Sequence, residues 1–152
     1  MRHFSLLLVG FVSLLCFGCG KPYSVGELWI RNESGQDVFV ESSIESATTS
    51  QISYFVLKNG AEKYIAQSRR YPNEVLEYIP LTDYIHNEDA YVSIYTISDK
   101  GDKLLAHKWY YSDRDNDGHE LFSEKSLTQD VGYLLDGGYF PRFTFTILPE
   151  DI

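Results

Sequence analysis

Alternation of apolar and polar residues is clearest in two stretches of the chain and predicts β-strands in both. Residues 91–97 alternate between two faces, and a polar turn at residues 98–102 leads into a second apolar segment at residues 103–111. Near the C-terminus, Phe143, Phe145 and Ile147 share one strand face, and polar residues occupy the other. Such alternation is typical of antiparallel sheets that bury one face and leave the other in water.

Two hairpins are expected in the N-terminal half. The first joins residues 27–32 to residues 38–44 through a polar, glycine-containing turn. The second joins residues 52–57 to residues 62–66. Its turn contains Asn59-Gly60, the pair that a type I′ turn prefers.

One helix is expected within residues 126–138. Ser126 and Gln129 have the spacing of a capping box, and Gly137-Gly138 can supply a left-handed stop. Four apolar residues between them share a helical face: Leu127, Val131, Leu134 and Leu135.

About seven or eight short strands and one late helix predict a mainly all-β fold, an antiparallel β-sandwich of immunoglobulin-like or similar topology. We expect it to form a single domain over residues 27–152. The aromatic content agrees, because 12 Tyr, 9 Phe and 2 Trp make up 15% of the chain and aromatic residues favour strands.

The N-terminus carries a different pattern. Residues 4–17 are apolar or uncharged and follow Arg2, which matches the first two regions of an export signal. The run is shorter than the roughly 20 residues that a transmembrane helix needs. No alanine precedes Ala47, so an ordinary signal-peptidase site of the Ala-x-Ala kind is missing.

The end of this run, SLLCFGCGKPYS, resembles the lipobox of bacterial lipoproteins. Gly18 is the small residue before the cysteine, and Cys19 is the cysteine that such proteins lipidate. Cys16 does not fit this role, because Leu15 would precede it; it stands where the family usually has Leu. The resemblance implies a signal peptide at residues 1–18 and an acylated Cys19, labelled by palmitate, with residues 19–26 as a tether to the domain.

The resemblance also implies a place in the cell. A diacyl group anchors without help from charge, since each buried methylene contributes about 0.8 kcal/mol. Among lipoproteins, acidic residues directly after the cysteine are associated with surface display, whereas here Gly20, Lys21 and Pro22 follow. We therefore expect a membrane-anchored envelope protein, at the outer membrane and facing the periplasm, with no disulfide once Cys16 is removed and Cys19 is acylated.

Charge narrows the class of partner. The 152 residues carry 13 basic and 22 acidic side chains, a net charge of −9, and removal of residues 1–18 would leave 134 residues and take away one further positive charge, Arg2. An acidic domain repels phosphate backbones, so nucleic acid is not an expected partner. The expected partner is a glycan or another envelope protein.

One segment matches the calcium-loop pattern D-x-[DN]-x-[DN]-G-x5-E in full, at residues 113–124. Carboxylates this close repel one another unless a cation lies among them. The expected ligands are the side chains of Asp113, Asp115, Asp117 and Glu124 and the carbonyl of His119. The alternative is a solvated acidic turn, since the segment before it resembles a strand and Asp, Asn and Gly are also ordinary turn residues.

Three aromatic residues, Trp109, Tyr110 and Tyr111, are candidates for a glycan-contacting surface. The alternative is that they belong to the core. Because neighbouring strand residues point to opposite faces, Trp109 and Tyr110 cannot both be core residues of a two-layer fold with one wet face.

No catalytic motif is present in the sequence: the histidines lack metal-ligand spacing, and no Gly-x-Ser-x-Gly or phosphate-binding glycine loop occurs. We therefore expect a non-catalytic structural or binding domain with no cofactor other than calcium. A glycan- or peptidoglycan-binding module with a structural calcium loop is one alternative, and a hydrolase whose site forms only in the fold is the other.

Overall fold

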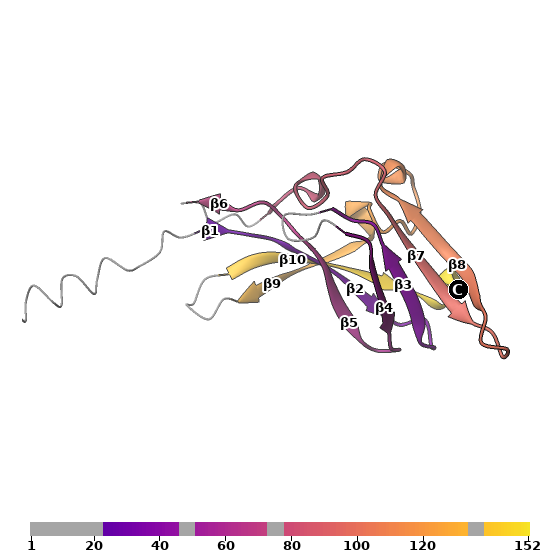
Figure 1. Cartoon of the computed structure of the whole chain (residues 1–152). Helices are drawn as coiled ribbons and strands as arrows, with labels where there is room; N and C mark the ends of the chain where they lie inside the picture. The colour runs from indigo at the N-terminus through magenta and orange to yellow at the C-terminus, as the bar shows by residue number, and fades with distance from the viewer. Residues whose placement is uncertain (1–22, 46–50, 73–77, 134–138) are drawn as a thin grey trace, which may run out of the picture.

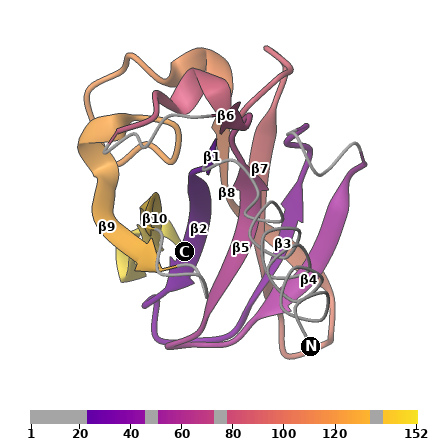
Figure 2. The ribbon, with the colours of Figure 1, turned by 90° about the vertical axis from the view of Figure 1, so that its left-hand side faces the viewer.

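The computed structural model describes residues 23–45, 51–72, 78–133 and 139–152. Two four-stranded sheets pack against each other, with strand orders β5-β2-β10-β9 and β4-β3-β7-β8, and a short β1-β6 pair lies at one end (Figures 1 and 2). The strands are β1 (Tyr23–Ser24), β2 (Glu27–Asn32), β3 (Val38–Ser42), β4 (Ser53–Leu57), β5 (Glu62–Gln67), β6 (Tyr71–Pro72), β7 (Tyr91–Ile97), β8 (Lys103–Tyr110), β9 (Leu127–Tyr133) and β10 (Tyr139–Ile147).

Helical structure in the described residues is limited to four 3-10 turns: η1 (Leu81–Asp83), η2 (Tyr111–Asp113), η3 (Glu124–Ser126) and η4 (Pro149–Asp151). A helix of the length and hydrophobicity that a bilayer requires does not occur in this part of the chain. The fold is therefore a mainly-β, sandwich-like arrangement of two sheets, which confirms the predicted class.

The core lies between the two sheets and follows the predicted alternation. Phe143, Phe145 and Ile147 of β10 are buried, as are Leu28 and Ile30 of β2. The facing sheet contributes Val38, Val40, Val92, Ile94 and Trp109. The predicted hairpin of residues 91–97 and 103–111 is confirmed, because β7 and β8 pair antiparallel.

The predicted antiparallel arrangement is wrong for one pair of strands. β2 and β10 run parallel, with Leu28 opposite Phe143 and Ile30 opposite Phe145, so this sheet is mixed. The two strands come from opposite ends of the domain, and pairing them places their apolar faces side by side over the core.

Both predicted N-terminal hairpins are also wrong, although their strands exist. β2 pairs with β5 and β3 pairs with β4, so each predicted turn carries the chain from one sheet to the other. Gly60 has the positive φ that its turn was expected to need, at 77°. A turn with a left-handed Gly60 is therefore present as predicted, but it joins the two sheets and does not join neighbouring strands of one sheet.

Asn32 connects these two crossings. Its buried side chain donates to the carbonyl oxygens of Gln36 and Leu57, at 2.8 and 2.9 Å, and accepts from the backbone N–H and the hydroxyl of Ser34. The Asn59 side chain also accepts from the N–H of Gly35. A buried amide with all these bonds made holds the crossings together.

The predicted helix at residues 126–138 is wrong as far as the structure describes it, because Leu127–Tyr133 forms β9 against β10. Ser126 does not cap a helix: its hydroxyl donates to the carbonyl of Gly118 and accepts from the N–H of Glu120. Gly132 lies so close to the Phe140 ring that a Cβ would fall 2.2 Å from it. Packing on β10 therefore outweighs the local helix signal.

Candidate functional site

The predicted calcium ligands lie in the connection between β8 and β9, but their side chains bond to different partners and do not face a common point. Asp117 forms an exposed ion pair with Lys125, at 3.0 Å. Glu124 Oε1 accepts from the hydroxyl of Tyr78 at 2.5 Å and from the N–H of Leu81 at 3.2 Å. The bond to Glu124 raises the pKa of Tyr78 to about 12.

The remaining ligands do not complete a cation site. Asp113 contacts the neighbouring Ser112 hydroxyl, and the carbonyl of His119 accepts from Trp109 Nε1 at 3.2 Å. Across the described residues, no three His, Cys, Asp or Glu side chains converge as a metal ion would require. The five predicted ligands thus do not fit calcium in this arrangement.

The same connection instead lines a cavity of about 330 Å³. The segment around η1 supplies the opposite wall, and the lining comprises Leu81, Thr82, Tyr111, Arg114, Asp115, Phe122, Ser123, Glu124 and Lys125. Tyr111 and Phe122 are buried beneath it, with ring centroids 5.6 Å apart. Burial raises the pKa of the Tyr111 hydroxyl.

The charged groups of the cavity balance one another. Arg114 and Lys125 supply two positive charges, and Asp115 and Glu124 supply two negative charges. Arg114 also pairs with Glu88 at 3.2 Å, and its guanidinium lies 4.4 Å from the centre of the Tyr111 ring. The cavity lining therefore offers hydrogen-bond donors and acceptors, with two charged side chains of each sign, and both of its cations are held by carboxylates outside the lining.

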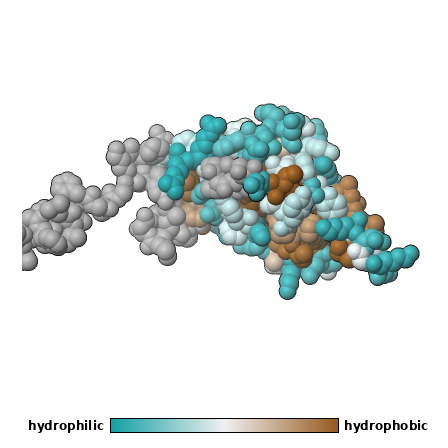
Figure 3. Space-filling view, in the orientation of Figure 1, coloured by the Kyte–Doolittle hydropathy of each residue, from teal (hydrophilic) through white to brown (hydrophobic). Residues whose placement is uncertain are grey.

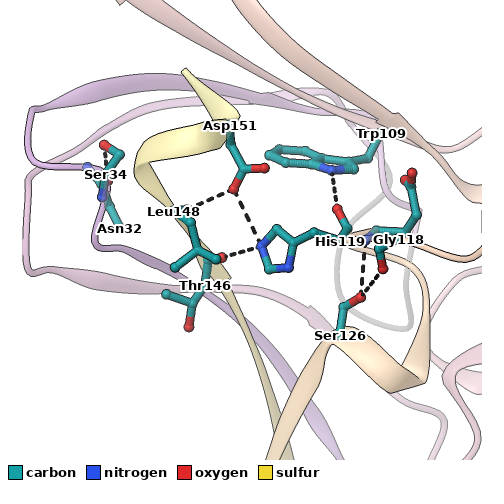
Figure 4. A network of polar contacts seen from close by, with 10 residues as sticks. Asn32, Ser34, Trp109, Gly118, His119, Ser126, Thr146, Leu148 and Asp151 are labelled. Carbon is teal, nitrogen blue, oxygen red and sulfur yellow. Dashed lines mark hydrogen bonds and ion pairs between the residues drawn. The ribbon is translucent and has the colours of Figure 1, made fainter.

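His119 fixes this loop to the C-terminus through a network that sequence reasoning missed (Figure 4). Its Nε2 donates to the carbonyl of Thr146 at 2.8 Å and lies 3.4 Å from the buried carboxylate of Asp151. Its ring stacks on Phe145, with centroids 4.6 Å apart. No local sequence signal joins residues 27 to 32 positions apart, so only the fold reveals this contact.

The three aromatic candidates differ in exposure, as strand alternation predicts. Trp109 and Tyr111 are buried, and Tyr111 reaches only the lining of the cavity, whereas Tyr110 is 43% exposed. The prediction that Trp109 and Tyr110 cannot both be core residues is confirmed.

Tyr110 belongs to a broader apolar face that the sequence did not reveal, the outer face of the β4-β3-β7-β8 sheet (Figure 3). The strand register aligns one row across all four strands: Val56, Phe39, Tyr95 and Leu105. Val56 and Leu105 are 61% and 57% exposed. Exposed apolar residues gathered on one sheet face make it a candidate interaction surface.

Polar groups on this face are bonded to its aromatic residues. The carboxylate of Glu41 accepts from the hydroxyls of Tyr91 and Tyr95, and the first bond raises the pKa of Tyr91 to about 12. Lys103 lies over the Phe39 ring and Lys108 over the Tyr91 ring, at 3.2 and 3.7 Å from their centres. The face therefore remains largely apolar although it carries charged residues.

Gly18 and Cys19, the predicted cleavage and lipidation positions, lie outside the described residues. Comparison of the chain with protein-family models, with curated proteins and with solved structures finds no match.

Proposed function

We propose that this chain is a lipid-anchored protein of the bacterial envelope whose β-sandwich is a non-catalytic binding domain, and that the cavity beside the β8–β9 connection takes a neutral saccharide. The lipobox-like residues Gly18 and Cys19 support the anchor. The balanced polar lining of the cavity carries the proposal for the ligand. An immunoglobulin-like topology stays a prediction beside the sandwich class.

The existing ion pairs of the cavity's cations favour a neutral polar ligand over an ion. A free anion would need unpaired cations, but Arg114 and Lys125 already pair with Glu88 and Asp117. A metal cation would need at least three converging ligands, and the described residues bring no such group of His, Cys, Asp or Glu side chains together. A saccharide offers hydroxyl groups that can both donate and accept, which suits Thr82, Arg114 and Asp115 together.

The cavity has a suitable size and setting. Its volume of about 330 Å³ is at the lower end of the range for small-molecule sites. Its walls are held by bonds between distant segments, such as that from Leu81 N–H to Glu124. Such preformed walls reduce the entropy cost of binding.

The binding proposal is tested with the full chain in detergent and an N-acetylglucosamine oligosaccharide as probe. Asp115→Ala is expected to weaken binding at least about tenfold, because a hydrogen bond to a charged group contributes about 1.5–3 kcal/mol. Asp99→Ala, which removes an exposed carboxylate from the β7–β8 turn, is the matched control and should leave binding unchanged. Absence of binding, or equal effects of both substitutions, would reject the saccharide site.

The same mixture separates binding from hydrolysis. Asp115 and Glu124 are two carboxylates at one cavity, which is the observation that favours a glycosidase as the second candidate. A binding module leaves the oligosaccharide intact, so release of shorter, reducing fragments would replace the proposal by the hydrolase.

The anchor is tested separately by metabolic labelling with palmitate. The label should be incorporated by the unaltered chain and by Cys16→Ala, and lost in Cys19→Ala. Cys16 is the matched control, since it lies three residues away in the same apolar run. Label that persists without Cys19 would contradict the proposed anchor.

A further inference from the structure

One edge of the sandwich differs from the other three. The edge strands of the two large sheets are β5, β9, β4 and β8. Three of them carry charged side chains that discourage pairing with another chain: Glu62 and Lys63 in β5, Lys103 and Lys108 in β8, and Asp130 in β9. β4, with the sequence SYFVL, carries none.

The backbone of β4 is open on its outer side as far as the structure describes the chain. The backbone N–H of Ser43, directly after β3, donates to the carbonyl of Tyr91 in β7. Because successive residues of a strand direct their backbone groups to opposite neighbours, Phe39 and Glu41 also face β7, and Val38, Val40 and Ser42 face β4. Ser53, Phe55 and Leu57 of β4 lie opposite these residues of β3 and direct their backbone groups to them. Tyr54 and Val56 therefore direct their N–H and C=O groups away from the sheet.

The side chains of these two residues are also available. Tyr54 and Val56 are 60% and 61% exposed on the apolar outer face of the sheet. An aromatic and a β-branched residue make a favourable cross-strand pair. Among the described residues, β4 thus presents unpaired backbone groups and apolar side chains on the side where a neighbouring strand would lie.

We propose that β4 pairs antiparallel with β4 of a second copy of this chain. Tyr54 then lies opposite the partner's Val56, and Phe55 lies opposite the partner's Phe55 on the two-fold axis. This register brings the outward N–H and C=O groups of Tyr54 and Val56 into a ladder with those of the partner. The two β4-β3-β7-β8 sheets join into one continuous sheet, and their apolar outer faces become one surface.

The self-complementary sequence of β4 is the reason for naming a second copy as the occupant. Each chain carries a net charge of −9, so contact between two copies is least opposed where the surface carries no charge. β4 is the edge strand without a charge of its own, so self-pairing there brings no like charges directly opposite each other. The sequence of β4 is also self-complementary in this register, as a two-fold contact requires.

The first test measures the mass of the full chain in detergent by light scattering. The unaltered chain should be a dimer, and Val56→Lys should raise the dissociation constant at least about tenfold, since a lysine on an edge strand opposes pairing. Leu105→Lys is the matched control: it alters the same row of the same face, at similar exposure, on the opposite edge. A monomeric unaltered chain would overturn the proposal, as would equal disruption by both substitutions or by neither. Circular dichroism confirms that both variants fold.

The second test examines the register. In full chains that carry Cys16→Ser and Cys19→Ser, copies with Tyr54→Cys are mixed with copies that carry Val56→Cys and are oxidised. Directly opposite Cα atoms in a hydrogen-bonded pair lie about 5.5 Å apart, within reach of a disulfide, whereas diagonal positions lie about 7–8 Å apart. The mixed pair should form a disulfide-linked dimer, and either variant alone should not. Linkage in a single-variant sample, or none in the mixture, would overturn this register.

Discussion

Asn32 contributes to the fold through four hydrogen bonds made by one buried amide. Removal of the side chain leaves the buried carbonyl of Leu57 without this donor and the buried N–H of Ser34 without its acceptor, whereas the carbonyl of Gln36 keeps the Ser34 hydroxyl as a donor. Each buried unpaired group costs about 1–3 kcal/mol, so Asn32→Ala is expected to lower the free energy of unfolding by about 3 kcal/mol.

Chemical denaturation measures this loss. Asn116→Ala, at an exposed loop position, serves as the control and should change the free energy of unfolding by less than about 0.5 kcal/mol. Equal stability of the two variants would show that the network does not hold the sheet crossings together.

Tyr84 presents the opposite case, a buried polar group without a partner among the described residues. Its ring packs edge-on against Phe143, and its hydroxyl fills the space beside Gly26. Burial raises the pKa of this hydroxyl well above its ordinary value. Tyr84→Phe is therefore expected to raise the free energy of unfolding by about 1 kcal/mol, measured in the same denaturation experiment. A clear loss of stability would mean that the hydroxyl is bonded in solution.

The exposure of single residues follows from the sequence where strand alternation governs it. The burial of Trp109 and the exposure of Tyr110 are one example. The partners of His119 could not be predicted in this way, because the fold brings Thr146 and Asp151 to it from the far end of the chain.

At the scale of the elements, a charge cluster joins three strands of the mixed sheet. Glu62 of β5 bonds to Arg142 of β10 and to Arg31 of β2. The bond from Arg142, followed by that from Arg31, lowers the pKa of Glu62 below its ordinary value of 4.5. The stabilisation is fully present above pH 4.5 and is lost as the pH falls through the lowered value, because the unfolded chain takes up the proton first.

Glu62→Gln should therefore be less stable than the unaltered chain at pH 6, and this difference should shrink as the pH falls below 4.5. Denaturation at a series of pH values measures the difference. Glu150→Gln, at an exposed position near the C-terminus, is the control for a carboxylate outside the cluster. A difference that stays constant down to the lowest pH would contradict the role of the cluster.

The acidic connection between β8 and β9 makes a further prediction. Because Asp117 and Glu124 are bonded elsewhere, calcium at millimolar concentration should leave the melting temperature the same as in chelator. Calcium at 100 times its dissociation constant would raise the stability by about 2.7 kcal/mol, and the melting temperature by about 5 °C or more. An increase of that size would show that the loop rearranges into the predicted calcium site.

Strands could be predicted from the sequence better than their partners could. Period-two patterns identified β7 and β10, because alternation is a local property that burial of one face imposes, and the polar turn after β7 identified β8. Which strands pair depends on whether the turn between them stays in one sheet or crosses to the other. A glycine with positive φ is compatible with both kinds of turn. The helix prediction failed at Ser126, whose hydroxyl closes the preceding loop.

At the scale of the whole molecule, the charge is spread unevenly. The chain carries a net charge of −9, yet β4 is uncharged and the cavity lining carries two charged side chains of each sign. Neither the β4 sequence nor the cavity lining, where we propose contacts, has an excess of acidic side chains of its own. An anchored domain with a saccharide cavity and a pairing edge would hold two binding sites at the same membrane surface, which increases avidity for a repetitive glycan.

The saccharide cavity is the central claim, and nuclear magnetic resonance tests it most directly. The full chain, labelled with ¹⁵N in detergent, is titrated with the N-acetylglucosamine oligosaccharide while its assigned backbone amides are followed. We predict shifts that saturate and that concentrate at Thr82, Asp115 and Lys125 around the cavity. Shifts confined to Tyr110 and its neighbours on the outer face of the β4-β3-β7-β8 sheet, or no saturable shift at all, would contradict the account.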